Sequence, residues 1–399
     1  MKILVICQYY YPEPFKIHEI CEELVKRGNE VTVITGRPNY PDGNLFPGYD
    51  NQDKMNEIIS GVHVIRTKIP LRGKNSISLV RNYFSYSRYA KKEIKKLDKE
   101  FDVVFVYQLS PVLMIKPALY YKKKYRKKVY VYCLDLWPES LKVLHIKEAN
   151  PIFKVLNLIC NRLYKKCDFI SVTSPAFINY LNEINKVELN KLSCIPQHGE
   201  NFFLKVKPYE KQDKLNITFA GNVGKAQDFD CLVRAVAQIP DSYYSKLKIT
   251  IIGSGSYETK FKQQVKENKL DSIFDFTGRK KVEELISYYN DTSLFLLSLE
   301  KDSKIGKTIP SKLQTYMAAG RGIIGSIDGT SADIIHDANA GMICSAGNDK
   351  ELAEIIMKMV DADDNLISIL SKNSRDYFMS NFTIDKYIDE ILKKLEELE

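Results

Sequence analysis

The fold is decided at the start of the chain, where residues 2–35 read KILVICQYYYPEPFKIHEICEELVKRGNEVTVIT. Lys2–Tyr9 is a short apolar run, which predicts a buried strand. Pro14–Gly28 carries apolar side chains at helical spacing and ends in Arg27-Gly28-Asn29, a helix stop signal. Glu30–Thr35 is a second apolar run of strand length. A strand, a helix and a strand in fewer than forty residues predict a βαβ unit and a parallel sheet.

The same alternation of short apolar runs and helical segments continues along the chain. The further strands that we predict are Asp102–Val106, Val129–Leu134, Phe169–Thr173, Leu192–Ile195, Asn216–Ala220, Lys248–Ile252, Ile273–Phe276, Ser293–Leu297 and Gly322–Ile327. Helices are predicted at Phe229–Ile239, at Lys260–Asn268 and from Ser311 onward. This pattern predicts the α/β class, with two facing Rossmann-like domains and an interdomain cleft.

Periodicity is lost between Gln197 and Lys214, which marks a boundary between the two halves. We therefore predict an N-terminal domain at 1–199, a linker at 200–214, a C-terminal domain at 215–372 and a C-terminal helix at 373–399 that packs back across the domains. Ligands of open parallel sheets bind at the carboxyl ends of the strands. We expect one side of the cleft to hold a nucleotide and the other side a second substrate.

Composition excludes several classes of protein. Of 399 residues, 44% are hydrophobic and 27% are charged, which rules out a disordered or low-complexity chain. No apolar run approaches the ~18 residues of a membrane-spanning helix, and the first apolar run predicts a strand and not a signal peptide. The 8 cysteines form no Cys-x-x-Cys pair and lie in apolar segments. We expect buried thiols of a cytoplasmic protein, with neither disulfides nor a zinc site.

Positive charge is concentrated in the first half of the chain. Residues 1–200 hold 32 basic and 20 acidic side chains, and 62–128 alone hold 18 basic and 4 acidic ones. Aromatic side chains are interleaved with these cations, as in Tyr120–Lys128. This mixture favours contact with an anionic membrane surface, although a solvated lysine-rich face would have the same composition. No nucleic-acid-binding motif supports a third interpretation.

Glycine-rich turns follow two predicted strands of the second half. Gly221–Gln227 (GNVGKAQ) and Gly253–Ser256 (GSGS) let the backbone approach an anion, although tight turns alone would explain them. The loop after the first strand lacks a Gly-x-Gly-x-x-Gly fingerprint, and Thr35-Gly36-Arg37 lacks the acid that binds ribose in NAD enzymes. The sequence therefore predicts a phosphate site in the second half and no nicotinamide cofactor.

The helix that begins at Pro310-Ser311 strengthens this prediction. Serine is suited to capping the free N–H groups of a first turn. Lys312 is electrostatically unfavourable in that turn, because the helix dipole prefers anions there. A bound diphosphate would correct the mismatch, whereas a solvated lysine is the alternative. Arg279 adds a cation at another strand end.

Asp135 and Glu139 follow a predicted strand of the first half. Carboxylates at this position are suited to holding sugar hydroxyls or accepting a proton from an alcohol. Asp135 would equally serve as a cap for nearby backbone N–H groups, and the sequence leaves both roles open.

Five stretches in chain order resemble retaining glycosyltransferases of the GT-B fold, family 4, and within them the bacterial surface-polysaccharide branch that includes the L-fucosamine (L-FucNAc) transferases. They are residues 10–17 (YYPEPFKI), 35–41 (TGRPNYP), 135–140 (DLWPES), 221–227 (GNVGKAQ) and 310–320 (PSKLQTYMAAG). The resemblance implies transfer of a hexosyl or N-acetylhexosaminyl group from a UDP-sugar with retention of anomeric configuration. The implied acceptor is a polyprenyl-diphosphate-linked glycan of capsule or O-antigen synthesis, at the inner face of the plasma membrane.

The resemblance also implies roles for individual residues. The C-terminal domain would bind the donor through Gly221, Asn222, Gly224, Lys225, Gln227, Arg279, Pro310, Ser311, Lys312, Gln314 and Thr315. Asp135 and Glu139 are the catalytic candidates, and the acceptor side would include Phe15, Lys16, Asn39 and Tyr40. The implied catalysis is electrostatic, so we expect no cofactor, no metal ion and no nucleic-acid partner.

The chain departs from the family at a pair of glutamates with seven residues between them, for which it has Lys307 and Thr315. The second of these glutamates usually binds ribose, and Gln314 or Thr315 would have to replace it. Two alternatives therefore stay open beside an active transferase: a non-catalytic nucleotide-sugar-binding protein and a UDP-sugar epimerase.

Overall fold

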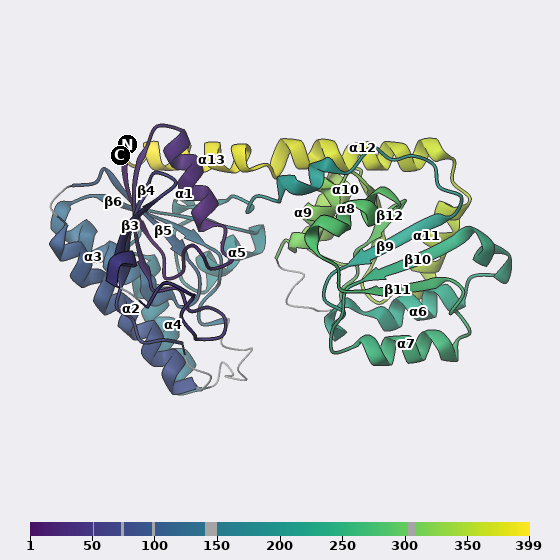
Figure 1. Ribbon diagram of the computed structural model, residues 1–399, viewed down its shortest axis with the longest axis horizontal. Helices are drawn as coiled ribbons and strands as arrows, with labels where there is room; N and C mark the ends of the chain where they lie inside the picture. The colour runs from purple at the N-terminus through teal and green to yellow at the C-terminus, as the bar shows by residue number, and fades with distance from the viewer. Residues whose placement is uncertain (51, 73–75, 98–99, 140–149, 302–307) are drawn as a thin grey trace. The chain divides into compact units, whose positions relative to one another are not determined.

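The chain divides into two compact units, which are coloured along the sequence in Figure 1. The computed structural model describes residues 1–50, 52–72, 76–97, 100–139, 150–301 and 308–399. The first unit comprises Met1–Ile195 and Ile388–Glu399, and the second comprises Pro196–Tyr387. Each unit contains its own, mostly parallel, sheet with helices packed on it. The predicted class, two Rossmann-like α/β domains, is confirmed.

The described strands of the first unit are β1 (Lys2–Ile6), β2 (Glu30–Gly36), β3 (Asn56–Ile59), β4 (Val62–Thr67), β5 (Val103–Gln108), β6 (Lys128–Cys133), β7 (Phe169–Val172) and β8 (Leu192–Cys194). They are arranged in the order β3-β4-β2-β1-β5-β6-β7-β8. Only the β3–β4 pair among them is antiparallel. We did not predict β3 and β4, because β3 is a four-residue edge strand and both lie in or beside the charged stretch.

The helices of the first unit are α1 (Ile17–Lys26), α2 (Ser76–Lys96), α3 (Ile115–Tyr125), α4 (Pro151–Tyr164) and α5 (Pro175–Glu183). Side chains of one sheet face, such as Leu4 and Val104, form a buried core with α2 to α5. Alternate residues point to the opposite face, where Phe105 stacks on Tyr130 at 5.4 Å. The end of helix α13 (Ile384–Glu396) reaches this face, since Lys394 lies 4.9 Å from the centroid of the Phe169 ring.

The described strands of the second unit are β9 (Leu215–Ala220), β10 (Leu247–Ile252), β11 (Phe274–Gly278), β12 (Leu294–Leu296), β13 (Gly322–Ser326) and β14 (Gly341–Cys344). All pair in parallel, in the order β11-β10-β9-β12-β13-β14. Strand order reverses at β9, which lies between β10 and β12. The carboxyl end of β9 is therefore the point at which a doubly wound sheet binds its ligand.

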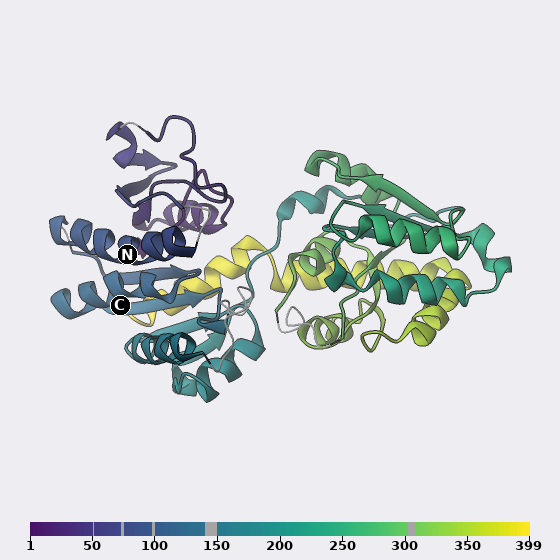
Figure 2. The same ribbon diagram turned by 90° about the horizontal axis from the view of Figure 1, so that it is seen from below.

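The helices of the second unit are α6 (Phe229–Ala237), α7 (Glu258–Glu267), α8 (Val282–Asn290), α9 (Ser311–Ala318), α10 (Thr330–Asp337), α11 (Asp349–Val360) and α12 (Asp364–Asn381). Two cores form because neighbouring strand residues point to opposite faces. Leu294 and Leu296 pack toward α6, α7 and α11, whereas Phe295 packs toward α9 and α10. Figure 1 and Figure 2 show these layers from two directions.

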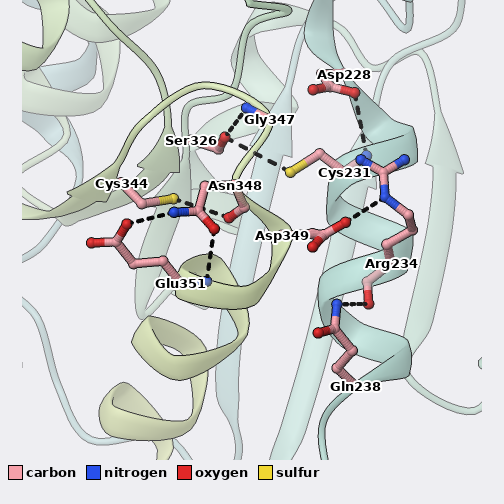
Figure 3. Close-up of polar contacts among 10 residues, drawn as sticks. All are labelled: Asp228, Cys231, Arg234, Gln238, Ser326, Cys344, Gly347, Asn348, Asp349 and Glu351. Carbon is pink, nitrogen blue, oxygen red and sulfur yellow. Dashed lines mark hydrogen bonds and ion pairs between the residues drawn. The ribbon is translucent and has the colours of Figure 1, made fainter.

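Polar contacts fix α6 and α11 against the ends of β13 and β14 (Figure 3). The Ser326 hydroxyl accepts a hydrogen bond from the Gly347 amide at 2.8 Å and lies 3.8 Å from the Cys231 thiol. Asn348 caps α11 by accepting from the Glu351 amide at 3.2 Å. All eight cysteines are free; Cys194 is half-buried, and the other seven, Cys231 among them, are buried. The predicted burial of the thiols is confirmed for seven of the eight cysteines.

Two parts of the chain differ from the simpler elements that we expected. The predicted linker packs on the second unit: Phe203 and Val206 are buried, and the Arg375 guanidinium donates to the carbonyl of Val206 at 3.0 Å. The C-terminal helix predicted at 373–399 is two helices, α12 and α13, interrupted at Phe382 and Thr383. Periodicity did not reveal the interruption, because both helices are amphipathic and continue the same charged pattern.

Candidate active site

A cavity of about 340 Å³ opens at the carboxyl ends of β9, β10 and β11 in the second unit. Six predicted donor-binding residues line it: Gly221, Asn222, Arg279, Ser311, Lys312 and Thr315. They come from the turn after β9, the turn after β11 and the first turns of α9. Segments nearly a hundred residues apart in sequence thus meet at the topological switch point.

The two glycine-rich turns pack directly against each other. The Gly221 amide donates to the Ile252 carbonyl at 2.9 Å, and the Val223 amide donates to the Ser254 carbonyl at 3.1 Å. A Cβ atom on Gly253 would lie 1.9 Å from the Gly221 carbonyl oxygen, and Gly253 has a φ of +137°. Glycine is therefore required for this close approach of backbones. The second turn, which was a weak signal by itself, is part of the same wall as the first.

Lys312 crosses the turn after β9. Its ammonium group lies 4.3 Å from the centroid of the Phe219 ring and donates a hydrogen bond to the side chain of Gln227. A Cβ on Gly221 would lie 3.2 Å from Lys312 Cδ, so glycine leaves room for this path. Burial lowers the pKa of Lys312 to about 8. Within the described residues no carboxylate pairs with Lys312, so its charge faces the cavity without a counter-ion.

The first turn of α9 contributes its backbone. Pro310, in an extended conformation, is the N-cap residue, and its side chain has no group that could cap this turn. The prediction that Ser311 acts as the cap was wrong, because Ser311 is the first helical residue and lines the cavity instead. The N–H groups of this first turn and Lys312 place positive potential at one end of the cavity.

Five predicted donor-binding residues lie outside the cavity lining: Gly224, Lys225, Gln227, Pro310 and Gln314. Lys225 is largely exposed and pairs with Glu300 at 3.8 Å, so the structure does not bring its charge to this site. Gln227 contacts Lys312 and thereby orients it. Gln314 is buried and donates to the backbone carbonyl of Gln197, whereas Thr315, the other residue considered as a replacement for the family's glutamate, lines the cavity. Lys307 lies outside the described residues.

Part of the cavity wall was not predicted, including Glu200, Phe203 and Tyr289. Phe203 stacks on Tyr289 at 5.3 Å, and Tyr316 fixes the end of β9 by accepting from the Ala220 amide at 2.9 Å. Lys280 adds a third cation to the lining, and Glu200 is its single carboxylate among the described residues. Phe203 and Glu200 belong to the predicted linker, which has no periodicity to indicate that it forms a wall.

In the first unit, two predicted acceptor-side residues belong to an aromatic cluster after β1 and β2. Phe15 stacks on Tyr9 at 5.0 Å and lies 5.0 Å from Tyr40. The Arg72 guanidinium lies 5.0 Å from the Tyr40 ring and donates to the Tyr9 hydroxyl at 3.2 Å. Lys16 precedes α1 as its N-cap residue. Tyr9 and Arg72 were not predicted, because 63 residues separate these partners in sequence.

Glu13 holds the loops of this cluster together and was not predicted as a site residue. Its carboxylate accepts hydrogen bonds from the backbone amides of Tyr10 at 3.1 Å, Asn39 at 2.9 Å and Tyr40 at 2.8 Å. Asn39 is itself buried and bonded to the Arg72 amide and the Arg37 carbonyl, so its side chain orders the loop. Burial raises the pKa of Glu13 to about 7, although these hydrogen bonds act in the opposite direction and lower it.

The two catalytic candidates follow β6. Asp135 accepts hydrogen bonds from the amide and the hydroxyl of Ser110, at 3.0 and 3.1 Å. Burial raises the pKa of Asp135, and the bonds from Ser110 oppose the rise. Glu139 accepts from the Tyr180 hydroxyl at 3.2 Å. Asp135 thus accepts a hydrogen bond from a backbone amide, as the capping alternative predicted. Ser140 of the same motif lies outside the described residues.

Helices α2 and α3 frame a basic groove of about 320 Å³ on the first unit. Arg88, Lys91 and Lys116 line it beside Phe84, whose side chain is 51% exposed. In the described part of the chain none of these three cations pairs with a carboxylate. Of the predicted cationic run, Lys122 instead pairs with Asp168 at 2.7 Å.

Comparison with known proteins agrees with this architecture. The family described as Glycosyltransferase Family 4 matches residues 17–197, and the family Glycosyl transferases group 1 matches residues 201–377. An uncharacterised glycosyltransferase of Methanocaldococcus jannaschii is 21% identical over 100% of this chain and 99% of its own length. The amylovoran biosynthesis glycosyltransferase AmsK of Erwinia amylovora is 25% identical over 122 residues, 30% of each chain.

Solved structures show the same fold. The sucrose-phosphate synthase of Thermosynechococcus elongatus matches with a TM-score of 0.72 and 16% identity, over 100% of this chain and 98% of that one. HepE of Anabaena in complex with UDP matches with a TM-score of 0.68 and 12% identity over 100% of both chains. The protein is therefore a glycosyltransferase of the GT-B fold. It belongs to the group 1 and family 4 glycosyltransferases, whose two family models together match residues 17–197 and 201–377. In the described residues no helix is both long and apolar enough to span a bilayer.

Glu13 makes the stability of the first unit depend on pH. Its pKa rises from an ordinary value of 4.5 to about 7, so the folded state retains a proton that the unfolded chain has released. This contribution to stability is complete below pH ~4.5 and is lost as pH rises to ~7. We therefore expect the difference between the melting temperatures of the wild type and of Glu13→Gln to change between pH ~4.5 and pH ~7, with the wild type losing stability relative to the variant as pH rises.

The matched control is Glu100→Gln, which removes an exposed carboxylate of the same unit. The difference between the melting temperatures of the wild type and of Glu100→Gln should stay constant over the same pH range. A Glu13→Gln difference that stays flat from pH 4.5 to 7 would show that the three backbone bonds, and not burial, set the ionisation of Glu13.

Proposed function

We propose that this protein transfers a sugar from a UDP-sugar to a lipid-linked glycan with retention of anomeric configuration. The observation that carries the proposal is the cavity at the switch point of the second sheet, in which Lys312 has no described counter-ion. A diphosphate supplies the negative charge that this cation and the first turn of α9 attract. Arg279 and the Gly221 turn complete the proposed diphosphate site.

Catalysis at this site follows from the same charges. When the bond between the anomeric carbon and the diphosphate breaks, negative charge grows on the departing UDP. Lys312, Arg279 and the first turn of α9 stabilise that charge without having to reorganise. The chain's own cations supply this stabilisation, so we propose a reaction that needs no divalent metal.

The relatives support the choice of donor and pathway. HepE was solved with UDP bound, and AmsK is named for the synthesis of the polysaccharide amylovoran. We propose a UDP-linked donor, an N-acetylated amino sugar as in the L-FucNAc branch, and capsule or O-antigen synthesis as the pathway. The acceptor that fits such a pathway is a polyprenyl-diphosphate-linked glycan.

The first unit would bind this acceptor at the carboxyl edge of its sheet. Phe15 and Tyr40 offer aromatic faces to sugar rings, with Arg72 beside them. Asp135 and Glu139 stand after β6, and Asp135 is the candidate for accepting the proton of the acceptor hydroxyl. The bonds from Ser110 hold that carboxylate in a fixed orientation.

Transfer itself is the direct test. Incubation with a panel of UDP-sugars and a polyprenyl-diphosphate-linked acceptor should release UDP and give a glycosylated lipid, and addition of EDTA should not change the rate. UDP release is measured by a coupled assay and the lipid product by mass spectrometry. Binding without turnover in the presence of every acceptor would instead indicate a non-catalytic protein, and interconversion of free UDP-sugars would indicate an epimerase.

Lys312→Met should weaken binding of UDP about 10- to 100-fold in isothermal titration calorimetry, because a charge-assisted contact is worth ~1.5–3 kcal/mol. Lys225→Met is the matched control, since it removes a lysine of the neighbouring turn that lies outside the cavity. Its affinity for UDP should stay within about twofold of the wild type. Equal losses in both variants would mean that the positive field of the whole unit, and not Lys312, binds the diphosphate.

We further propose that the first unit docks on the anionic inner face of the plasma membrane. Arg88, Lys91 and Lys116 line the groove between α2 and α3, and no carboxylate of the described residues neutralises their charge. The exposed Phe84 is placed to enter the lipid headgroup region beside them. Lys122, which is paired with Asp168, would contribute less than its sequence position suggests.

Replacing Arg88, Lys91 and Lys116 together by glutamine should abolish most binding to phosphatidylglycerol-containing vesicles in a sedimentation assay. Each cation near an anionic surface is worth ~1 kcal/mol, so the partition coefficient should fall about 100-fold. The control replaces Lys248, Lys262 and Lys372 by glutamine, which removes the same net charge from ion-paired sites of the second unit. Equal losses in both triple variants would contradict a specific docking face.

A further inference from the structure

We propose that Glu200 binds the ribose hydroxyls of the nucleotide and so replaces the glutamate that α9 lacks. This inference rests on the proposed function and assigns a residue that sequence reasoning did not consider. The carboxylate comes from the segment between the two units' sheets, and not from the helix that carries the diphosphate site. Four observations support it.

The first observation is the position of Glu200. It lines the same cavity as Thr315 and Lys312, and it lies within electrostatic reach of the buried hydroxyl of Tyr289. Its neighbour Gly199 packs on α9, since a Cβ there would lie 3.2 Å from the Cβ of Gln314. Gln314 directly precedes Thr315, so the Glu200 segment runs beside the turn of α9 that would otherwise have to contact ribose.

The second observation is that the backbone around Glu200 is fixed on both sides. The Gly199 amide donates to the Phe382 carbonyl at 2.8 Å. Phe203, three residues further on, is buried against Tyr289. A carboxylate between two anchored residues loses little backbone freedom when it binds a ligand, which favours a specific contact.

The third observation is the chemistry of the cavity. A nucleoside diphosphate has two distinct polar ends: the diphosphate needs donors and cations, whereas the vicinal ribose hydroxyls can donate to an acceptor. The charged side chains of the cavity lining other than Glu200 are Arg279, Lys280 and Lys312, and all three are cations. Glu200 is therefore the one charged acceptor of the described lining, and hydrogen bonds from hydroxyls to carboxylates are stronger than those to neutral oxygens.

The fourth observation is that Glu200 is available. The Glu200 side chain is exposed, and within the described residues its carboxylate makes no hydrogen bond and no ion pair. Thr315, by contrast, offers a single short hydroxyl from α9. A ribose that entered the cavity would thus meet an acceptor that has no competing protein donor.

The test compares UDP with 2′-deoxy-UDP and 3′-deoxy-UDP in the wild type and in Glu200→Gln. Because a hydrogen bond to a charged group contributes ~1.5–3 kcal/mol, the wild type should prefer UDP over at least one deoxy analogue by about 10- to 100-fold. Glu200→Gln should reduce that preference to threefold or less, through weaker binding of UDP and nearly unchanged binding of the analogue. Glu283→Gln, which neutralises an exposed carboxylate on α8, is the matched control and should keep the preference.

Inorganic pyrophosphate separates this inference from the proposed function. Its affinity should be the same for wild type and Glu200→Gln, because it has no ribose. A Glu200→Gln variant that keeps the full preference for UDP, or that loses UDP, both analogues and pyrophosphate equally, would overturn the role of Glu200 and leave the transferase intact. Absence of UDP binding to the wild type would instead remove the proposed function itself.

Discussion

The second unit depends on a positive charge held where protein structure normally avoids one. Lys312 lies in the first turn of α9, where the helix dipole disfavours a cation, and it is mostly buried. The Phe219 ring and the Gln227 side chain offset part of that cost, yet the pKa of Lys312 still falls. Such a conflict with local rules is expected at a functional site, because a ligand that carries the missing charge resolves it.

The topology of the second sheet makes this arrangement possible. Reversal of strand order at β9 opens the sheet edge, and the turns after β9 and β10 approach each other closely because Gly253 has no Cβ. The N-terminus of α9 then faces the gap across the Gly221 turn, which lets the Lys312 side chain pass. Topology, glycine placement and helix direction thus converge on one volume, which explains why a single cavity gathers residues from distant segments.

Sequence reasoning succeeded where a signal was local and failed where it depended on packing. Most of the described strands were predicted because apolar runs of strand length repeat, whereas β3, β4 and β14 were not predicted. Lys312 was predicted because a cation in the first turn of a helix is unusual. Lys225 lies in the glycine-rich loop after β9, but its side chain pairs with Glu300 and does not line the cavity. The spacing of residues in the sequence gives no sign of that direction. Glu200 and Phe203 lie in a stretch without periodicity, and Tyr9 meets Arg72 only through the fold.

The carboxylates of the first unit show how one group can have structural and chemical roles together. Both bonds from Ser110 to Asp135 fall on Oδ2, and they fix the side chain where the loops after β5 and β6 meet. Glu13 is bonded in a comparable way to three backbone amides, but it lies between two loops and is almost fully buried. Asp135 is only half-buried, so it combines a fixed orientation with access to a substrate. This difference in exposure, and not the hydrogen bonding, makes Asp135 the better candidate for proton transfer, whereas Glu13 holds together the loops after β1 and β2.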